Sequence, residues 1–162
     1  MSRTTIQIAN QQAVVAVDRA AVRRTVREVL RARGVRGARV SVAVVDDSAM
    51  RELKKAYYGM AEATDVLSFD LGGEEGEEPP GEESWSLDIE VVVNAQRAQR
   101  EAAGRRAEVE GELHLYLVHG LLHQMGYDDG TAAAARAMHE EEDRLLTALG
   151  YGAVYSSKRA KR

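Results

Sequence analysis

The chain has 162 residues, of which 44% are hydrophobic and 30% are charged, and it contains no cysteine. This length suits one domain with its own core, and the lack of cysteine excludes disulfides and thiolate metal sites. The formal net charge is −4, but residues 70–86 alone hold seven acids and no base. Because the acidity is concentrated in one segment, the overall charge does not exclude a polyanionic partner.

No apolar run approaches the roughly 20 residues that a membrane-spanning helix needs. The first residues also lack the apolar stretch of a secretory leader. We therefore expect a cytoplasmic protein.

The first half of the chain alternates between strand-like and helix-like segments. The expected elements are a first strand over 4–9 or 13–17, a helix over 18–34, a strand over 40–45, a capped helix over 46–58 and a short strand over 65–69. The first helix has Asp18 at its N-cap position. Its arginines form either a phosphate-binding patch or an ordinary solvated face.

The second half is mainly helical. Residues 70–86 hold both prolines and the acid run, which predicts a mobile surface loop inside the domain. The further expected elements are a strand over 88–93 and helices over 96–103, 108–125 and 131–149. The helix over 108–125 is apolar on most sides, so we expect it to be buried and central.

These elements predict an α/β fold: a single compact domain with a small mixed sheet and helices packed on it. The domain is expected to span 1–155, with residues 70–86 as its acidic surface loop. Residues 156–162 form a basic C-terminal tail, and we expect the chain from 155 onward to be disordered.

One segment of the central helix carries residue types suited to metal binding. His119 and His123 are four residues apart, which places both imidazoles on one helix face about one turn apart. Gly126 can then turn the chain back and bring Asp128 or Asp129 to the same ion. Two histidines at this helical spacing are by themselves more often packed side chains than metal ligands, but the added glycine turn and carboxylates favour an ion.

The spacing of these histidines also occurs in zinc peptidases. Those enzymes have a glutamate general base directly after the first histidine. Here Gly120 occupies that position, so a peptidase mechanism lacks its base. We therefore regard peptide hydrolysis as a disfavoured alternative.

Residues 119–129 resemble the signature of the YbeY family, bacterial single-strand-specific endoribonucleases linked to rRNA maturation and ribosome quality control. Residues 64–69, Thr-Asp-Val-Leu-Ser-Phe, match a family strand, and residues 87–89 resemble another. Residues 112–119 resemble the helix that leads into the histidines. The ordered set covers most of residues 40–150.

The resemblance implies a compact α/β fold with one zinc ion per chain, bound on the central helix by His119, His123 and Asp129. It implies RNA as the substrate, in particular rRNA of the small ribosomal subunit. Ribosomal proteins or assembly factors are further candidate partners, and neither a membrane nor DNA is expected.

This sequence departs from the family at three positions. Asp129 stands where the family has a third histidine, which makes the ligand set harder and lets manganese compete. Tyr58 replaces an arginine that suits phosphate binding, and Leu87 replaces a glycine. A second hypothesis is therefore a ribosome-associated binding factor with a weak or silent metal site.

The substrate pocket is less well defined by the sequence. By the same resemblance, its candidate residues are Tyr58, Thr64, Asp65, Ser68 and Asp88. No residue is an obvious general base, and the catalytic residues stay unassigned.

Two further histidines lie outside the motif. His114 is about 140° round the helix from His119, so we expect it to pack elsewhere. His139 lies in an acidic stretch, and we expect it on a solvated face, as a spare ligand if Asp129 does not bind.

Overall fold

The computed structural model describes residues 3–72, 85–102 and 106–160. Its elements, in chain order, are β1 Thr5–Asn10, α1 Arg19–Ala32, β2 Ala38–Val45, α2 Asp47–Tyr58, β3 Val66–Asp70, β4 Leu87–Asn94, α3 Ala95–Glu101, α4 Arg106–Gln124, α5 Ala132–Ala148 and α6 Val154–Ala160. The predicted acidic loop falls largely on residues 73–84, which lie outside the described residues.

The four strands form one mixed sheet in the order β1-β2-β4-β3. β1, β2 and β4 are parallel, and β3 pairs antiparallel with β4. Of the two candidates for the first strand, the earlier one is strand β1. The later one is not a strand: the side chain of Gln12 accepts the N–H groups of Val14 and Val15, which fold this segment locally.

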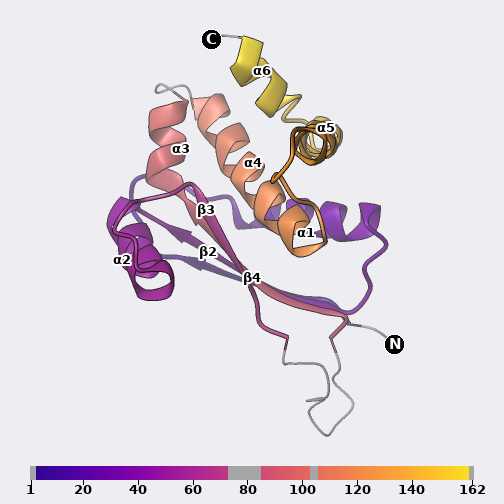
Figure 1. Cartoon of the computed structure of the whole chain (residues 1–162), viewed down its shortest axis with the longest axis horizontal. Coiled ribbons are helices and arrows are strands. Elements are labelled where there is room, and N and C mark those ends of the chain that lie inside the picture. Colours follow the sequence, from indigo (N-terminus) through magenta and orange to yellow (C-terminus); the bar gives the residue numbers. More distant parts are fainter. Residues whose placement is uncertain (1–2, 73–84, 103–105, 161–162) are drawn as a thin grey trace, which may run out of the picture.

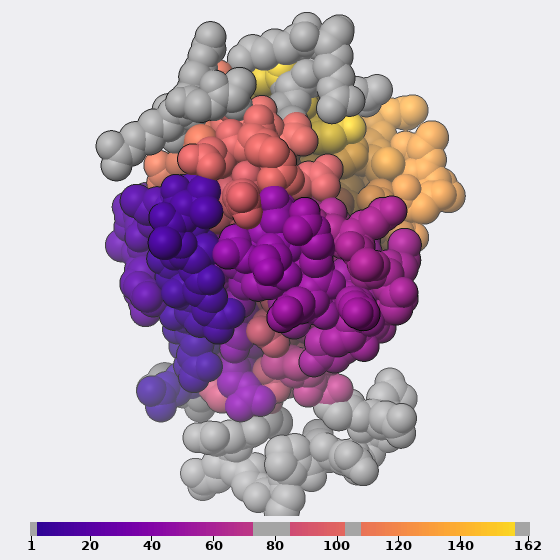
Figure 2. Space-filling view, turned by 90° about the vertical axis from the view of Figure 1, so that its left-hand side faces the viewer, coloured from indigo at the N-terminus to yellow at the C-terminus, as the bar shows by residue number. Residues whose placement is uncertain are grey.

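Helices cover the two faces of the sheet unequally (Figure 1). The larger core joins α1, α3, α4 and α5 to the side chains of β2 and β4 that point to one face, such as Val42 and Val91. The smaller core joins Met50 of α2 to the other face, where Val45 and Val92 point. Figure 2 looks at the side where α2 lies, with the indigo N-terminal segment beside the purple residues that include α2.

α4 is buried along most of its length, as its apolar sequence predicts. It packs directly on the sheet, because Gly120 permits a close approach. A β-carbon at this position would lie 2.7 Å from Val91 Cγ1 and 3.0 Å from Val66 Cγ2. The predicted α/β fold, with a small mixed sheet and a central helix, is therefore confirmed.

The expectation of a disordered tail is wrong up to residue 160, because the helix α6 occupies most of this segment. Its start is capped by Asp143 of α5, whose carboxylate accepts the backbone N–H groups of Tyr155 and Ser156. No helix in the described part of the chain is long and apolar enough to cross a membrane.

Candidate functional site

The two motif histidines lie at the C-terminal end of α4. The chain turns there as the sequence predicts: Gly126 has a φ of 98°, and the N–H of Tyr127 donates to Leu122 O at 3.1 Å. Such a left-handed glycine ends a helix and reverses the chain. His119 is partly buried, with a side chain that is 28% exposed, and His123 is exposed.

The turn distinguishes the two candidate carboxylates. Asp128 Oδ1 accepts the N–H groups of Asp129 at 2.7 Å and Gly130 at 3.1 Å, so this side chain closes the turn. Asp129 is exposed, and no hydrogen bond to another described residue occupies its carboxylate. The geometry therefore favours Asp129 over Asp128 as a donor to an ion.

A residue that the sequence analysis missed holds His119 in place. Glu142 of α5 is 1% exposed, and its two oxygens lie 2.7 Å from His119 Nδ1 and 2.7 Å from His139 Nδ1. The signal for it is an acid on the apolar stripe of α5, which also carries Met138 and Leu145. The helical periodicity of α5 predicts that Glu142 is buried, but it does not predict that Glu142 contacts His119 of α4.

His139 does not lie on a solvated face as expected. Its side chain is 22% exposed, and its ring stacks on Tyr155 of α6 with centroids 3.5 Å apart. Because Nδ1 is engaged by Glu142, only Nε2 is available to another partner. His139 is therefore a component of the packing between α5 and α6.

The charge environment of His119 favours its protonated form. Burial opposes the charged ring, but the hydrogen bond and charge of Glu142 outweigh it and raise the pKa of His119 above its ordinary value. The negative charges of Asp65 and Asp129 act in the same direction. The same carboxylates that favour a proton here also favour a bound cation.

The predicted pocket residues around β3 lie beside the end of α4. Ser68 accepts a hydrogen bond from Gln124 Nε2 at 2.9 Å. Asp65 Oδ1 accepts the N–H of Val66 at 2.7 Å, which fixes the carboxylate at the start of the strand. Thr64 Oγ1 donates to the same oxygen at 3.3 Å.

The other two predicted pocket residues are Asp88 and Tyr58, and neither contacts the motif histidines in the described part of the structure. Asp88 shares the sheet face of Val92, on the side of α2, and forms an ion pair with Arg39 at 2.5 Å. Tyr58 ends α2 and is 53% exposed.

Among the described residues, no three His, Asp or Glu side chains form a ready metal-binding group. The three predicted ligands nevertheless have chemistry that fits an ion. His119 has one ring nitrogen held by a carboxylate, which leaves the other for a ligand bond. His123 lies one turn away, and Asp129 acts electrostatically on His119.

Two further polar residues are buried and hydrogen-bonded, His114 away from the site and Asn94 beside Thr64. His114 is 2% exposed, as its predicted packing requires, and its Nδ1 lies 2.8 Å from Thr25 Oγ1. Asn94, which the sequence analysis missed, is fully buried at the end of β4. Its Nδ2 donates to Asp47 Oδ1 at 2.8 Å and to Thr64 O at 3.0 Å.

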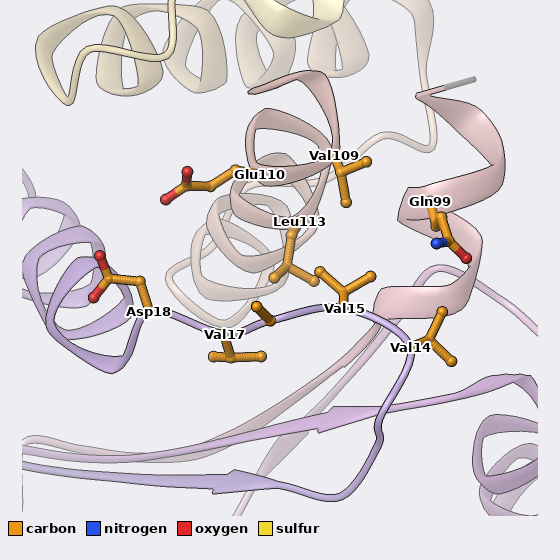
Figure 3. A pocket seen from close by; sticks show the side chains of 9 residues that line it. Val14, Val15, Val17, Asp18, Gln99, Val109, Glu110 and Leu113 are labelled. Atoms are coloured by element: carbon orange, nitrogen blue, oxygen red, sulfur yellow. The ribbon is translucent and has the colours of Figure 1, made fainter. Parts of the chain in front are cut away.

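A cavity of about 610 Å³ lies elsewhere, among the segment before α1, α3 and the first half of α4 (Figure 3). Valines and Leu113 form its apolar wall, and Asp18 and Glu110 lie at one end. Leu113 is ten residues before His123, about 15 Å along the helix. The cavity therefore does not belong to the histidine site.

Comparison with known proteins identifies close relatives. A family model described as endoribonuclease YbeY matches residues 7–150. The endoribonuclease YbeY of Moorella thermoacetica is 36% identical over 151 residues, which cover 88% of this chain and 96% of that protein. The one of Anaeromyxobacter sp. strain Fw109-5 is 42% identical over 121 residues, and the match covers 75% of this chain but 59% of that longer relative.

The fold also has a counterpart among solved structures. The solution structure of TM1509 from Thermotoga maritima aligns with a TM-score of 0.56 over 97% of this chain and 93% of that chain. The two sequences are 21% identical, so this likeness concerns the fold alone.

Proposed function

Because this chain belongs to the endoribonuclease YbeY family, we propose that it is a metal-dependent endoribonuclease that cleaves single-stranded RNA. Its proposed substrate is rRNA of the small ribosomal subunit, during maturation and ribosome quality control in the cytoplasm. Ribosomal proteins or assembly factors are its proposed partners.

One observation carries the proposal: a buried carboxylate holds Nδ1 of His119 on the helix where the motif predicts a metal ligand. Histidines that bind metals commonly donate their second nitrogen to such a carboxylate. His123 lies one turn further on, and Asp129 follows the glycine turn. We propose these three residues as the ligands of one zinc ion.

A zinc ion held by His119, His123 and Asp129 would supply Lewis acidity toward a phosphoryl oxygen or a water molecule. The chain itself would orient His119 through Glu142 and hold the start of β3 beside the site through Gln124 and Ser68. No described residue is assigned as the general base.

The test is cleavage of a single-stranded RNA by the purified protein, with zinc measured by elemental analysis. We expect about one zinc per chain, lost in His119→Ala, and cleavage that disappears with a chelator and in His123→Ala. Cleavage that persists in both variants and in chelator contradicts the proposal.

A ribosome-associated binding factor is the second candidate, because Tyr58 and Asp129 replace an arginine and a histidine of the resembled pattern. Ribosome binding with retained metal but no RNA cleavage would favour it. A peptidase is disfavoured further, since position 120 faces Val91 of the sheet, where no glutamate fits.

A further inference from the structure

Glu142 forms an unusual bridge between two histidines. It comes from α5, it is 1% exposed, and each of its oxygens lies 2.7 Å from the Nδ1 of a different imidazole. One of these rings belongs to α4 and the other to α5. A buried ionised carboxylate is costly unless donors satisfy both oxygens, so an ionised Glu142 requires an N–H on each ring.

An ionised Glu142 is compatible with only one tautomer of a neutral His119. An ionised carboxylate only accepts hydrogen bonds, and a neutral imidazole has a single N–H. In the neutral ring, the proton must therefore sit on Nδ1, which leaves the lone pair on Nε2.

We propose that Glu142 is a positioning residue that fixes the Nδ1–H tautomer and the orientation of His119, so that Nε2 faces a metal ion. The consequence for metal binding rests on the proposed function, but the tautomer does not. Glu142 itself is not a ligand in this proposal, since both of its oxygens are occupied by the two rings.

His139 has a supporting part in the same arrangement. It donates to the second oxygen of Glu142, and its ring is held by the stack on Tyr155. Glu142 Oε1 is thus held by His139, which packs between α5 and α6, and Oε2 points to His119 of α4. This explains how a side chain on α5 can set the orientation of a ring on α4.

The first experiment needs no variant and no metal. Nitrogen-15 NMR of the metal-free wild-type protein, at a pH where the rings are neutral, distinguishes the two imidazole tautomers. We expect both His119 and His139 to carry the proton on Nδ1. A His119 ring protonated on Nε2 instead overturns the proposal, whether or not the protein binds zinc.

The second experiment uses Glu142→Gln, which has nearly the same shape but only one acceptor oxygen and an NH₂ donor. It can accept from one imidazole only, so the other ring must change tautomer or lose its bond. Glu140→Gln is the matched control, because Glu140 is exposed on the same helix. Both variants are titrated with zinc alone, and their folding is checked by circular dichroism.

We expect Glu142→Gln to weaken zinc binding by roughly tenfold to a hundredfold, the usual effect of losing such a partner. The control should stay within about twofold of the wild type. An unchanged zinc affinity in a folded Glu142→Gln protein overturns the proposal. If Glu142→Gln does not fold, the NMR measurement of the His119 tautomer in the wild type decides the proposal about Glu142. If the wild-type protein binds no zinc, the proposed function fails and the tautomer proposal is judged by NMR alone.

Discussion

Gly120 of α4 lies against Val91 of β4 so closely that a β-carbon would be 2.7 Å from Val91 Cγ1. A side chain at this position would therefore displace the helix from the sheet. His119, which contacts Glu142 of α5, immediately precedes Gly120, so neighbouring residues of α4 carry the contact to the sheet and the contact to α5.

Gly120→Ala should destabilise the protein by up to about 2 kcal/mol. Overpacking a core costs about 1–3 kcal/mol, and the better helix propensity of alanine offsets about 1 kcal/mol. Thermal unfolding measures the loss. The control is Gly111→Ala in the same helix, whose β-carbon would lie at 3.3 Å from the side chain of Val154. A loss equal to or smaller than that of the control would contradict the close-packing argument.

Asp129→Ala should weaken zinc binding by at least about tenfold. Losing a metal ligand should lower zinc affinity at least as much as losing a residue that hydrogen-bonds to a ligand, which typically lowers it about tenfold or more. Asp128→Ala should change zinc affinity by less than about threefold while destabilising the turn, since Asp128 accepts two backbone N–H groups there. Calorimetric zinc titration of both variants checks this. The reverse order of effects would assign Asp128 as the ligand.

Tyr58→Arg should raise the rate of RNA cleavage about tenfold. A charge-assisted hydrogen bond to phosphate contributes about 1.5 kcal/mol, and 1.4 kcal/mol corresponds to a factor of ten. Tyr57→Arg is the control, because Tyr57 is also exposed but packs against Phe69 with ring centroids 5.0 Å apart. If both variants cleave at the same rate, the added charge acts non-specifically and position 58 has no special role.

The buried His114 should make the protein less stable in mild acid. Burial lowers the pKa of His114 from 6.5 to about 4. Between these values the unfolded chain binds the proton and the folded chain does not, so stability is full above pH 6.5 and falls as the pH drops.

The protonation of His114 in the unfolded chain should lower the free energy of unfolding by about 2 kcal/mol between about pH 7 and pH 5. It is measured as the difference in pH dependence between wild type and His114→Gln, by urea unfolding. The subtraction removes the other titrating groups, including His119, whose raised pKa acts in the opposite direction. Parallel stability curves for the two proteins would disprove the assignment.

Asn94→Ala should destabilise the protein by about 2–4 kcal/mol. The variant removes the side-chain oxygen that accepts the N–H groups of Gln96 and Arg97 at the start of α3. It also removes the amide donor to Asp47 Oδ1 and Thr64 O, so that Asp47 keeps only its pair with Arg100 among these contacts. Asn10→Ala, at an exposed position, is the control in urea unfolding. A loss below about 1 kcal/mol would mean that water replaces the amide.

Local periodicity was sufficient to predict most of the fold. The N-cap at Asp18, the buried helix α4 and the turn at Gly126 all depend on residues within a few positions of one another. The predicted helix that ends in this turn therefore placed both motif histidines correctly.

The missed features depend on partners that are distant in the sequence. Glu142 contacts His119 across 23 positions, and Asn94 contacts Asp47 across 47. α6 was missed because its start depends on Asp143 of the preceding helix rather than on a capping residue of its own. Such pairs are set by how helices pack, which spacing along one element does not determine.

The order of the strands has a consequence for synthesis of the chain. β3 pairs only with β4 among the described strands, although it precedes β4 in the sequence. During translation β1 and β2 can associate early, but β3 has no partner until residue 94 has left the ribosome. The backbone groups of β3 that pair with β4 therefore stay unpaired on the nascent chain for that interval, although Leu67 already has Val45 and Met50 of the preceding elements to pack against.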